Sequence, residues 1–203
     1  MGYYTRVLSQ RADVPDFEEL AAALLMDGIA ASLSVGDSDD GVWTSLLLSK
    51  PDGAPIAFLE RCMVAEGDIG ADEVDELLDT LEGCKPVDGA GWVANYLTSI
   101  KAIYAFEHLE GADDEDGHAA LQALRAHVFD KAAGILQADS EGFSNEDGYQ
   151  VGWQFDEAVE GSWWMALRQN GDWITFQMEL GDPAHRAAFQ EGRVPPGAFV
   201  GKA

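Results

Sequence analysis

The sequence is poor in cysteine and contains no long apolar run. Cys62 and Cys84 are the two cysteines among 203 residues. They lie far apart and form neither a CxxC pair nor a metal-type Cys/His spacing, so we expect buried free thiols. No apolar stretch approaches the roughly 20 residues that a membrane-spanning helix needs, and residues 1–11 lack the apolar segment of a signal peptide. We therefore expect a cytoplasmic protein with no membrane partner.

Basic residues are also scarce. Twelve Lys and Arg stand against 37 Asp and Glu, which gives a formal net charge of −25. Such a surface repels nucleic acids and anionic membranes and attracts cations and basic proteins. A high-salt or GC-rich source would produce the same composition without any functional role for the acidity. An acidic inhibitor, or a protein that imitates nucleic acid to bind a basic partner, is one alternative function.

Motifs for catalysis and cofactor binding are missing. GxSxG, HExxH, GxxxxGK and GxGxxG do not occur, so nucleophilic, zinc and nucleotide sites have no local signature. The acidic turns at residues 37–41 and after Asp113 lack the Glu that ends an EF-hand loop, because Leu48 and Leu124 stand at the twelfth position. We expect no cofactor and no metal, and the sequence assigns no catalytic residue.

The stretch of residues 149–180 holds four of the six tryptophans and alternates like a three-stranded antiparallel meander. Asn170-Gly171 suits a two-residue type I′ turn, which needs positive φ at both positions. This turn places Leu167 opposite Ile174. Counting outward from that pair gives one apolar face, and the remaining members of that face are Trp163, Met165, Phe176 and Met178.

The opposite face is mostly polar but carries two tryptophans. Trp164 falls opposite Gln177, and Arg168 falls opposite Trp173, a pairing that permits a cation–π contact of about 0.5–1 kcal/mol. We predict that these four residues bind a ligand or partner. The alternative is that the two tryptophans are ordinary cross-strand packing under a loop or helix. The loop at residues 142–148 is rich in Asn, Asp and Gly, which is typical of any turn-forming loop.

The rest of the chain indicates an α+β protein, with two three-stranded antiparallel meanders separated by a helical middle and covered by helices. The meanders form two sheets or one continuous sheet. We expect one domain over residues 1–203, or two packed halves, 1–88 and 89–203. The expected strands are 3–8, 29–35, 42–50 and 56–64 before the tryptophan-rich meander, the expected helices are 15–27, 71–81, 92–108, 117–137 and 182–191, and the end after Pro195 is expected to fray.

The missing motifs favour a non-enzymatic binding or interaction protein whose partner is an unknown protein or small molecule. A small-molecule enzyme with a carboxylate/histidine site assembled from distant residues is the first alternative, because active sites need not show local motifs. The acidic inhibitor is the second. A deep pocket with a histidine and a carboxylate of strongly shifted pKa would favour the enzyme.

The net charge of −25 predicts that salt stabilises the fold. Like charges on a compact surface repel, and the Debye length falls from about 10 Å at 0.1 M to about 3 Å at 1 M ionic strength. The midpoint of thermal unfolding should therefore rise between low and molar sodium chloride. A midpoint that stays flat or falls would contradict this expectation.

Overall fold

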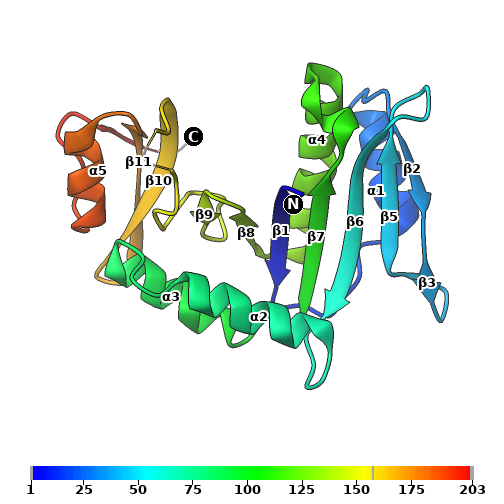
Figure 1. Ribbon diagram of the computed structural model, residues 1–203, viewed down its shortest axis with the longest axis horizontal. Coiled ribbons are helices and arrows are strands. Elements are labelled where there is room, and N and C mark those ends of the chain that lie inside the picture. The colour runs from blue at the N-terminus through cyan, green and yellow to red at the C-terminus, as the bar shows by residue number, and fades with distance from the viewer. Residues whose placement is uncertain (1, 157, 202–203) are drawn as a thin grey trace. The chain divides into compact units, whose positions relative to one another are not determined.

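A computed structural model describes residues 2–156 and 158–201, which form an α+β fold, as predicted. The chain divides into two compact units, each built from two segments (Figure 1). The first unit is Met1–Asp72 with Ile100–Gly134, and the second is Glu73–Ser99 with Ile135–Ala203. The expected division into one domain, or into halves 1–88 and 89–203, stays a prediction. Within the described ranges, no helix is long and apolar enough to cross a membrane.

The first unit is built on antiparallel strands in the order β2-β5-β6-β7-β1. The strands β2, β5 and β6 form the expected first meander, with a small β3–β4 hairpin inserted between β2 and β5. The bounds are β1 Tyr4–Ser9, α1 Phe17–Met26, β2 Ser32–Val35, β3 Ser38–Asp39, β4 Val42–Trp43, β5 Ser45–Ser49, β6 Pro55–Met63, β7 Ala102–His108, η1 Glu110–Asp113 and α4 Glu115–Ala132.

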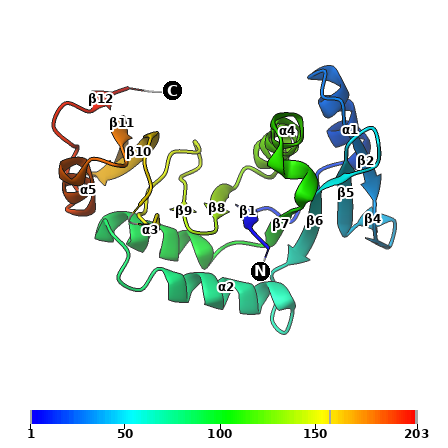
Figure 2. The same ribbon diagram turned by 45° about the horizontal axis from the view of Figure 1, so that its top comes forward.

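One face of this sheet forms the core of the first unit. Cross-strand pairing aligns alternate residues of the four strands β5, β6, β7 and β1 on that face, and α1 and α4 cover it (Figures 1 and 2). Burying such a row of large side chains supplies the main driving force for folding, at about 25 cal/mol per Å² of apolar surface. The fully buried members of the row are Val7, Leu46, Leu48, Leu59, Tyr104 and Phe106.

The predicted helix 92–108 is wrong in its second half. The helix α3 spans Val87–Leu97, and the chain then turns through Thr98 and Ser99 into the strand β7. Because β7 lies between β1 and β6 and is buried on both faces, it has no polar alternation. A short apolar run of this kind cannot be told from a buried helix by periodicity. For the same reason the predicted helix 117–137 was too long, since α4 ends at Ala132 and a strand begins at Ile135.

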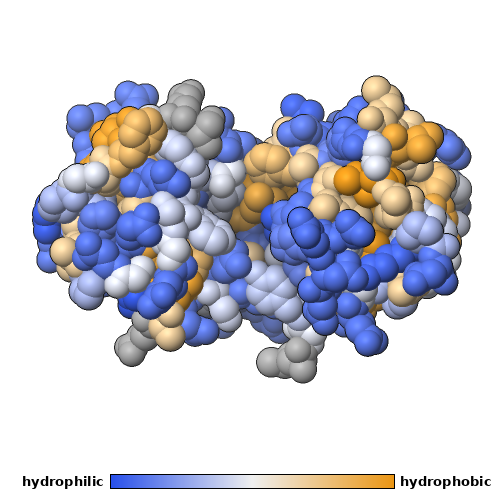
Figure 3. All heavy atoms as spheres, turned by 90° about the horizontal axis from the view of Figure 1, so that it is seen from above, coloured by the Kyte–Doolittle hydropathy of each residue, from blue (hydrophilic) through white to orange (hydrophobic). Residues whose placement is uncertain are grey.

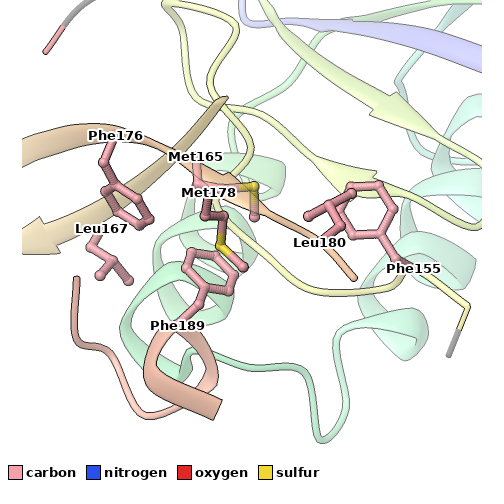
Figure 4. Close-up of a cluster of buried hydrophobic side chains, with 7 residues drawn as sticks. All are labelled: Phe155, Met165, Leu167, Phe176, Met178, Leu180 and Phe189. Carbon is pink, nitrogen blue, oxygen red and sulfur yellow. The ribbon is translucent and has the colours of Figure 1, made fainter. Parts of the chain in front are cut away.

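The second unit contains α3, a three-stranded sheet in the order β10-β11-β12, and the helix α5. One face of this sheet packs with α5 into a core (Figure 4), whose buried members are Phe155, Met165, Leu167, Phe176, Met178, Leu180 and Phe189. The remaining bounds are β8 Ile135–Ala138, β9 Gly142–Phe143, β10 Ser162–Gln169, β11 Asp172–Glu179, α5 Pro183–Gln190 and β12 Phe199–Val200, and α2 (Ile69–Thr80) contains the boundary between the units.

The predicted first strand of the tryptophan-rich meander is not a strand. Around Gln150 the backbone forms single bridges to Ser144 and to Met165, and Trp153 bridges to Lys85. The alternating apolar residues of this segment are largely buried, so the pattern correctly marked a core segment. The hydrogen bonds are divided among three neighbours instead of one ladder, which the pattern of apolar residues alone does not reveal.

The third strand of this sheet comes from the C-terminal segment, so the prediction that the chain frays after Pro195 is wrong for Phe199 and Val200. Phe199 pairs with Gln177 and Val200 with Phe176 across β11 and β12. Pro195, Pro196 and Gly197 end regular structure locally, as predicted, but the chain resumes pairing two residues later. A pairing across more than twenty residues has no signal in the local sequence.

The two cysteines are free thiols, and the expectation that they are buried is only partly met. Cys62 and Cys84 are each half-buried. Cys62 lies on β6, and Cys84 follows α2, where its thiol donates to the carbonyl of Thr80.

Two glycines of α3 provide a matched stability test. A Cβ at Gly89 would lie 2.2 Å from the carbonyl oxygen of Val151, whereas one at Gly91 would meet nothing within 4 Å. Gly89→Ala should lower the free energy of unfolding by about 1–3 kcal/mol, because the backbone must shift to make room. Gly91→Ala should raise it by about 0.5–1 kcal/mol through helix propensity. Denaturant titration measures both changes, and equal effects would show that α3 does not pack closely on Val151.

Candidate binding face

The β10–β11 hairpin has the predicted turn and register. Asn170 and Gly171 both have positive φ, 53° and 94°, as a type I′ turn requires. Leu167 pairs with Ile174. The predicted register is therefore confirmed. Met165, Phe176 and Met178 are buried on the predicted core face, whereas Trp163, expected on the same face, is 37% exposed.

The four residues predicted to bind a partner form two cross-strand pairs on the outer face. Arg168 lies opposite Trp173, with its guanidinium carbon 5.9 Å from the centre of that indole ring. Trp164 lies opposite Gln177. Arg168 is exposed and the other three side chains are half-buried. The outer face is thus partly open to solvent.

The two pairs do not form one continuous surface. Ala166 and Thr175 lie between them along the strands and are buried, and α3 packs against β10. Trp92 of α3 meets Trp173 edge to face, with ring centres 4.9 Å apart and an interplanar angle of 88°. Aromatic pairs of this geometry contribute about 0.5–1.5 kcal/mol beyond their buried area. Trp173 therefore serves packing within the unit as well as any contact it makes outside it.

Around Trp164 the aromatic surface is more open. Its ring lies 5.9 Å from that of Tyr149 and 6.0 Å from that of Phe199, centre to centre. Phe199 is 63% exposed and its neighbour Val200 is 58% exposed. Because Gln177 of β11 pairs with both residues, Trp164 of β10 and Phe199 of β12 lie on either side of its side chain. The sequence reasoning missed Phe199, since its position depends on the pairing of β12 with β11.

The loop at residues 142–148 has a defined structure that comes from one side chain. Asn145 is fully buried, and its Oδ1 accepts from the backbone N–H groups of Asp147 and Tyr149, at 3.1 and 2.9 Å. These bonds make an Asx-type turn, in agreement with the turn-forming interpretation. The Asn145 Nδ2 has no hydrogen-bond partner among the described residues, and a buried donor in that state costs about 1–3 kcal/mol.

This loop also influences a buried tyrosine of α3. Burial, together with a smaller effect of the negative charge of Glu146, raises the pKa of Tyr96 to about 12. The Tyr96 hydroxyl therefore remains protonated at neutral pH. It is therefore not available as a base.

The histidines bear on the enzyme alternative. His185 of α5 accepts from the backbone N–H of Glu179 through Nδ1, at 3.1 Å, which leaves its Nε2–H to donate to the carbonyl of Pro196. In the first unit, His127 of α4 meets Asp27, with Nε2 2.8 Å from the carboxylate oxygen. The first histidine bonds to the backbone, and the second belongs to a surface pair between two helices.

The cavities of the second unit and the possible metal ligands also bear on the enzyme alternative. In the second unit, cavities of about 420 and 370 Å³ have no histidine in their linings. Within residues 2–156 and 158–201, no three His, Cys, Asp or Glu side chains are grouped to hold a metal ion. The chemistry present on the outer face is aromatic stacking, cation–π attraction and amide hydrogen bonding, which suits binding.

Truncation of one residue on each face of the hairpin tests this division. Trp173→Ala should lower the free energy of unfolding by about 1–2 kcal/mol, the size of a half-exposed cross-strand contact plus one aromatic pair. Phe176→Ala should lower it by about 3–5 kcal/mol, because it leaves a cavity in the core. Denaturant titrations give both values. Equal losses would mean that Trp173 is a core residue and not part of a binding face.

Comparison with known proteins supplies no further identification. The chain matches no protein family, no curated protein and no solved structure.

Proposed function

We propose that this chain is a non-enzymatic binding protein that holds a partner on the outer face of the β10-β11-β12 sheet. The single observation that carries the proposal is the ring contact between the half-buried Trp164 and the exposed Phe199, on a sheet whose other face is packed into a core. Aromatic residues of this kind are enriched at interfaces and among the residues that dominate binding energy. Trp164, Arg168, Trp173 and Gln177 are the proposed contact residues.

The sheet favours binding because it is rigid where the contacts lie. Met165 and Leu167 are buried on the core side of β10, directly beside Trp164 and Arg168 on the outer side. Contact side chains that are held in place lose little conformational freedom when a partner binds. The two half-buried tryptophans are therefore presented in a nearly fixed arrangement.

A protein partner that is basic fits this face best. The net charge of −25 attracts basic proteins and repels nucleic acids. Arg168 is the one cation within β10, β11 and β12, and it is in contact with Trp173. Aromatic side chains and a Gln amide leave room for apolar and hydrogen-bonding contacts from the partner.

An acidic inhibitor remains a second candidate because of how carboxylates are displayed. The helix α2 exposes Asp75, Glu76 and Asp79. Separately, the face of the molecule drawn in Figure 3 is largely hydrophilic, and its hydrophobic residues form separate patches. A partner held by charge alone would be released by salt, since exposed charges are screened beyond about one Debye length. A partner held on aromatic side chains would resist salt.

Site-specific photocrosslinking tests the proposal. A photoreactive amino acid replaces Phe199 of the outer face or, as a control, Leu25, an exposed apolar residue of α1. In extract of the source cells, position 199 should capture a protein that position 25 does not. Trp164→Ala should reduce that capture about tenfold, as for a contact worth about 1.4 kcal/mol, and molar salt should reduce it less.

Two results would contradict the proposal. Equal capture at both positions would show that the outer face has no special role. Capture that is lost in molar salt but unaffected by Trp164→Ala would favour the acidic inhibitor over binding through the aromatic face.

A further inference from the structure

A cavity in the first unit has none of the residues of the proposed binding face in its lining. It has a volume of about 620 Å³, within the range of about 300–1,000 Å³ that is typical of small-molecule sites. It lies where the start of α1 meets the β3–β4 hairpin, which extends from the sheet beside β2 and β5 (Figures 1 and 2). All residues that line it belong to the first unit.

Two buried aromatic side chains fix the segment that forms one wall. The indole Nε1–H of Trp43 donates to the carbonyl of Pro15 at 2.8 Å, and the hydroxyl of Tyr104 donates to the carbonyl of Asp13 at 3.1 Å. Burial raises the pKa of Tyr104 to about 12, so this hydroxyl keeps its proton at neutral pH. The Arg61 Nε–H donates in turn to the carbonyl of Trp43. The cavity is therefore largely preformed.

The walls are mainly apolar and include two aromatic rings. Val35 and Val42 are 45% and 41% exposed, which is more than β-branched apolar residues usually are. Their exposed surface lies along the cavity, where a ligand would remove it from water. The apolar lining residues are Val14, Pro15, Phe17, Val35, Val42 and Trp43.

The charged groups of the lining are both carboxylates. Asp16 accepts from the backbone N–H of Glu19 through one oxygen, and no described Lys, Arg or His forms an ion pair with Asp16 or Glu18. The next carboxylate along the helix differs, since Glu19 pairs with Lys131. The cavity therefore presents two negative charges without a cation of its own.

The N-terminal end of α1 does not reverse this sign. A helix start carries a positive charge of about half an elementary charge, which is less than the charge of a single carboxylate. A second cavity of the first unit shows the alternative arrangement. Its lining includes Asp114 together with Lys50, which forms an ion pair with that carboxylate.

We propose that the cavity binds a small organic cation with an apolar tail, such as an alkylamine. The ammonium group lies at Asp16 and Glu18, and the tail lies along Phe17, Val42 and Trp43. An anion is repelled by the same carboxylates, and a compact inorganic cation leaves the apolar walls uncovered. This site is independent of the outer face of the β10-β11-β12 sheet.

Titration with a homologous series of amines tests the proposal. Butylamine, pentylamine and hexylamine should shift the NMR signals of the Trp43 indole N–H and of the Phe17 and Val42 amides. Affinity should rise about fourfold for each added methylene, the ratio that corresponds to about 0.8 kcal/mol per buried CH₂. Hexanol should bind more weakly than hexylamine, and hexanoate more weakly still.

Neighbouring carboxylates supply a matched pair of variants. Glu18→Gln should weaken hexylamine binding at least threefold and leave hexanol binding unchanged, because only the charge is removed. Glu19→Gln, one residue along the same helix, should change neither, since its side chain does not line the cavity. Val42→Thr should weaken both ligands by replacing part of the apolar wall with a hydroxyl.

Several outcomes would overturn the proposal. If hexylamine, hexanol and hexanoate bound with equal affinity, the charge of the ligand would have no role. If affinity did not depend on chain length, the apolar walls would have no role. Equal effects of Glu18→Gln and Glu19→Gln would show a nonspecific attraction of cations to the acidic surface. A lysine-containing apolar peptide that binds where hexylamine does not would show that the occupant is a protein segment.

Discussion

The first unit depends on the central strand β7, whose backbone is hydrogen-bonded on both edges and whose side chains are buried on both faces. Its pairing with β1 and β6 joins residues that are at least 39 positions apart in sequence. Tyr104 and Phe106 from this strand fill the core beneath α1 and α4. Tyr104 also reaches Asp13 through its hydroxyl, so the strand positions the segment that leads into α1. The strand β7 therefore holds the sheet together, helps to place α1 and supports one wall of the cavity.

The sequence predicted local elements well where a specific residue dictates backbone conformation. Asn170-Gly171 determined the β10–β11 turn and, through it, the register of eight residue pairs. Asp182 and Pro183 likewise marked the start of α5, where the aspartate accepts from two backbone N–H groups of the first turn. In each case the information lies within a few residues, because turns and caps are made by short-range bonds.

The failures arose where burial on all sides removed the periodic signal. The apolar run that forms β7 follows α3 closely and reads as its continuation, because β7 does not alternate with polar residues. The segment around Gln150 shows the opposite case, in which a clear alternation belongs to irregular backbone with three bonding neighbours. Both errors come from tertiary contacts that override local pattern. The same limit applies to the candidate face, where Trp164 and Trp173 were found from the hairpin, but Phe199 and Trp92 come from remote segments.

The arrangement of the two units as four alternating segments constrains how the chain folds during synthesis. The strands of Met1–Asp72 emerge first, but the strand that must lie between β1 and β6 emerges only after Glu73–Ser99 has been made. Until then β1 and β6 each have an unpaired edge, and exposed edges invite association with other chains. The dense negative charge of the chain opposes such association, because like-charged nascent chains repel. The acidity therefore acts during assembly as well as on the finished surface.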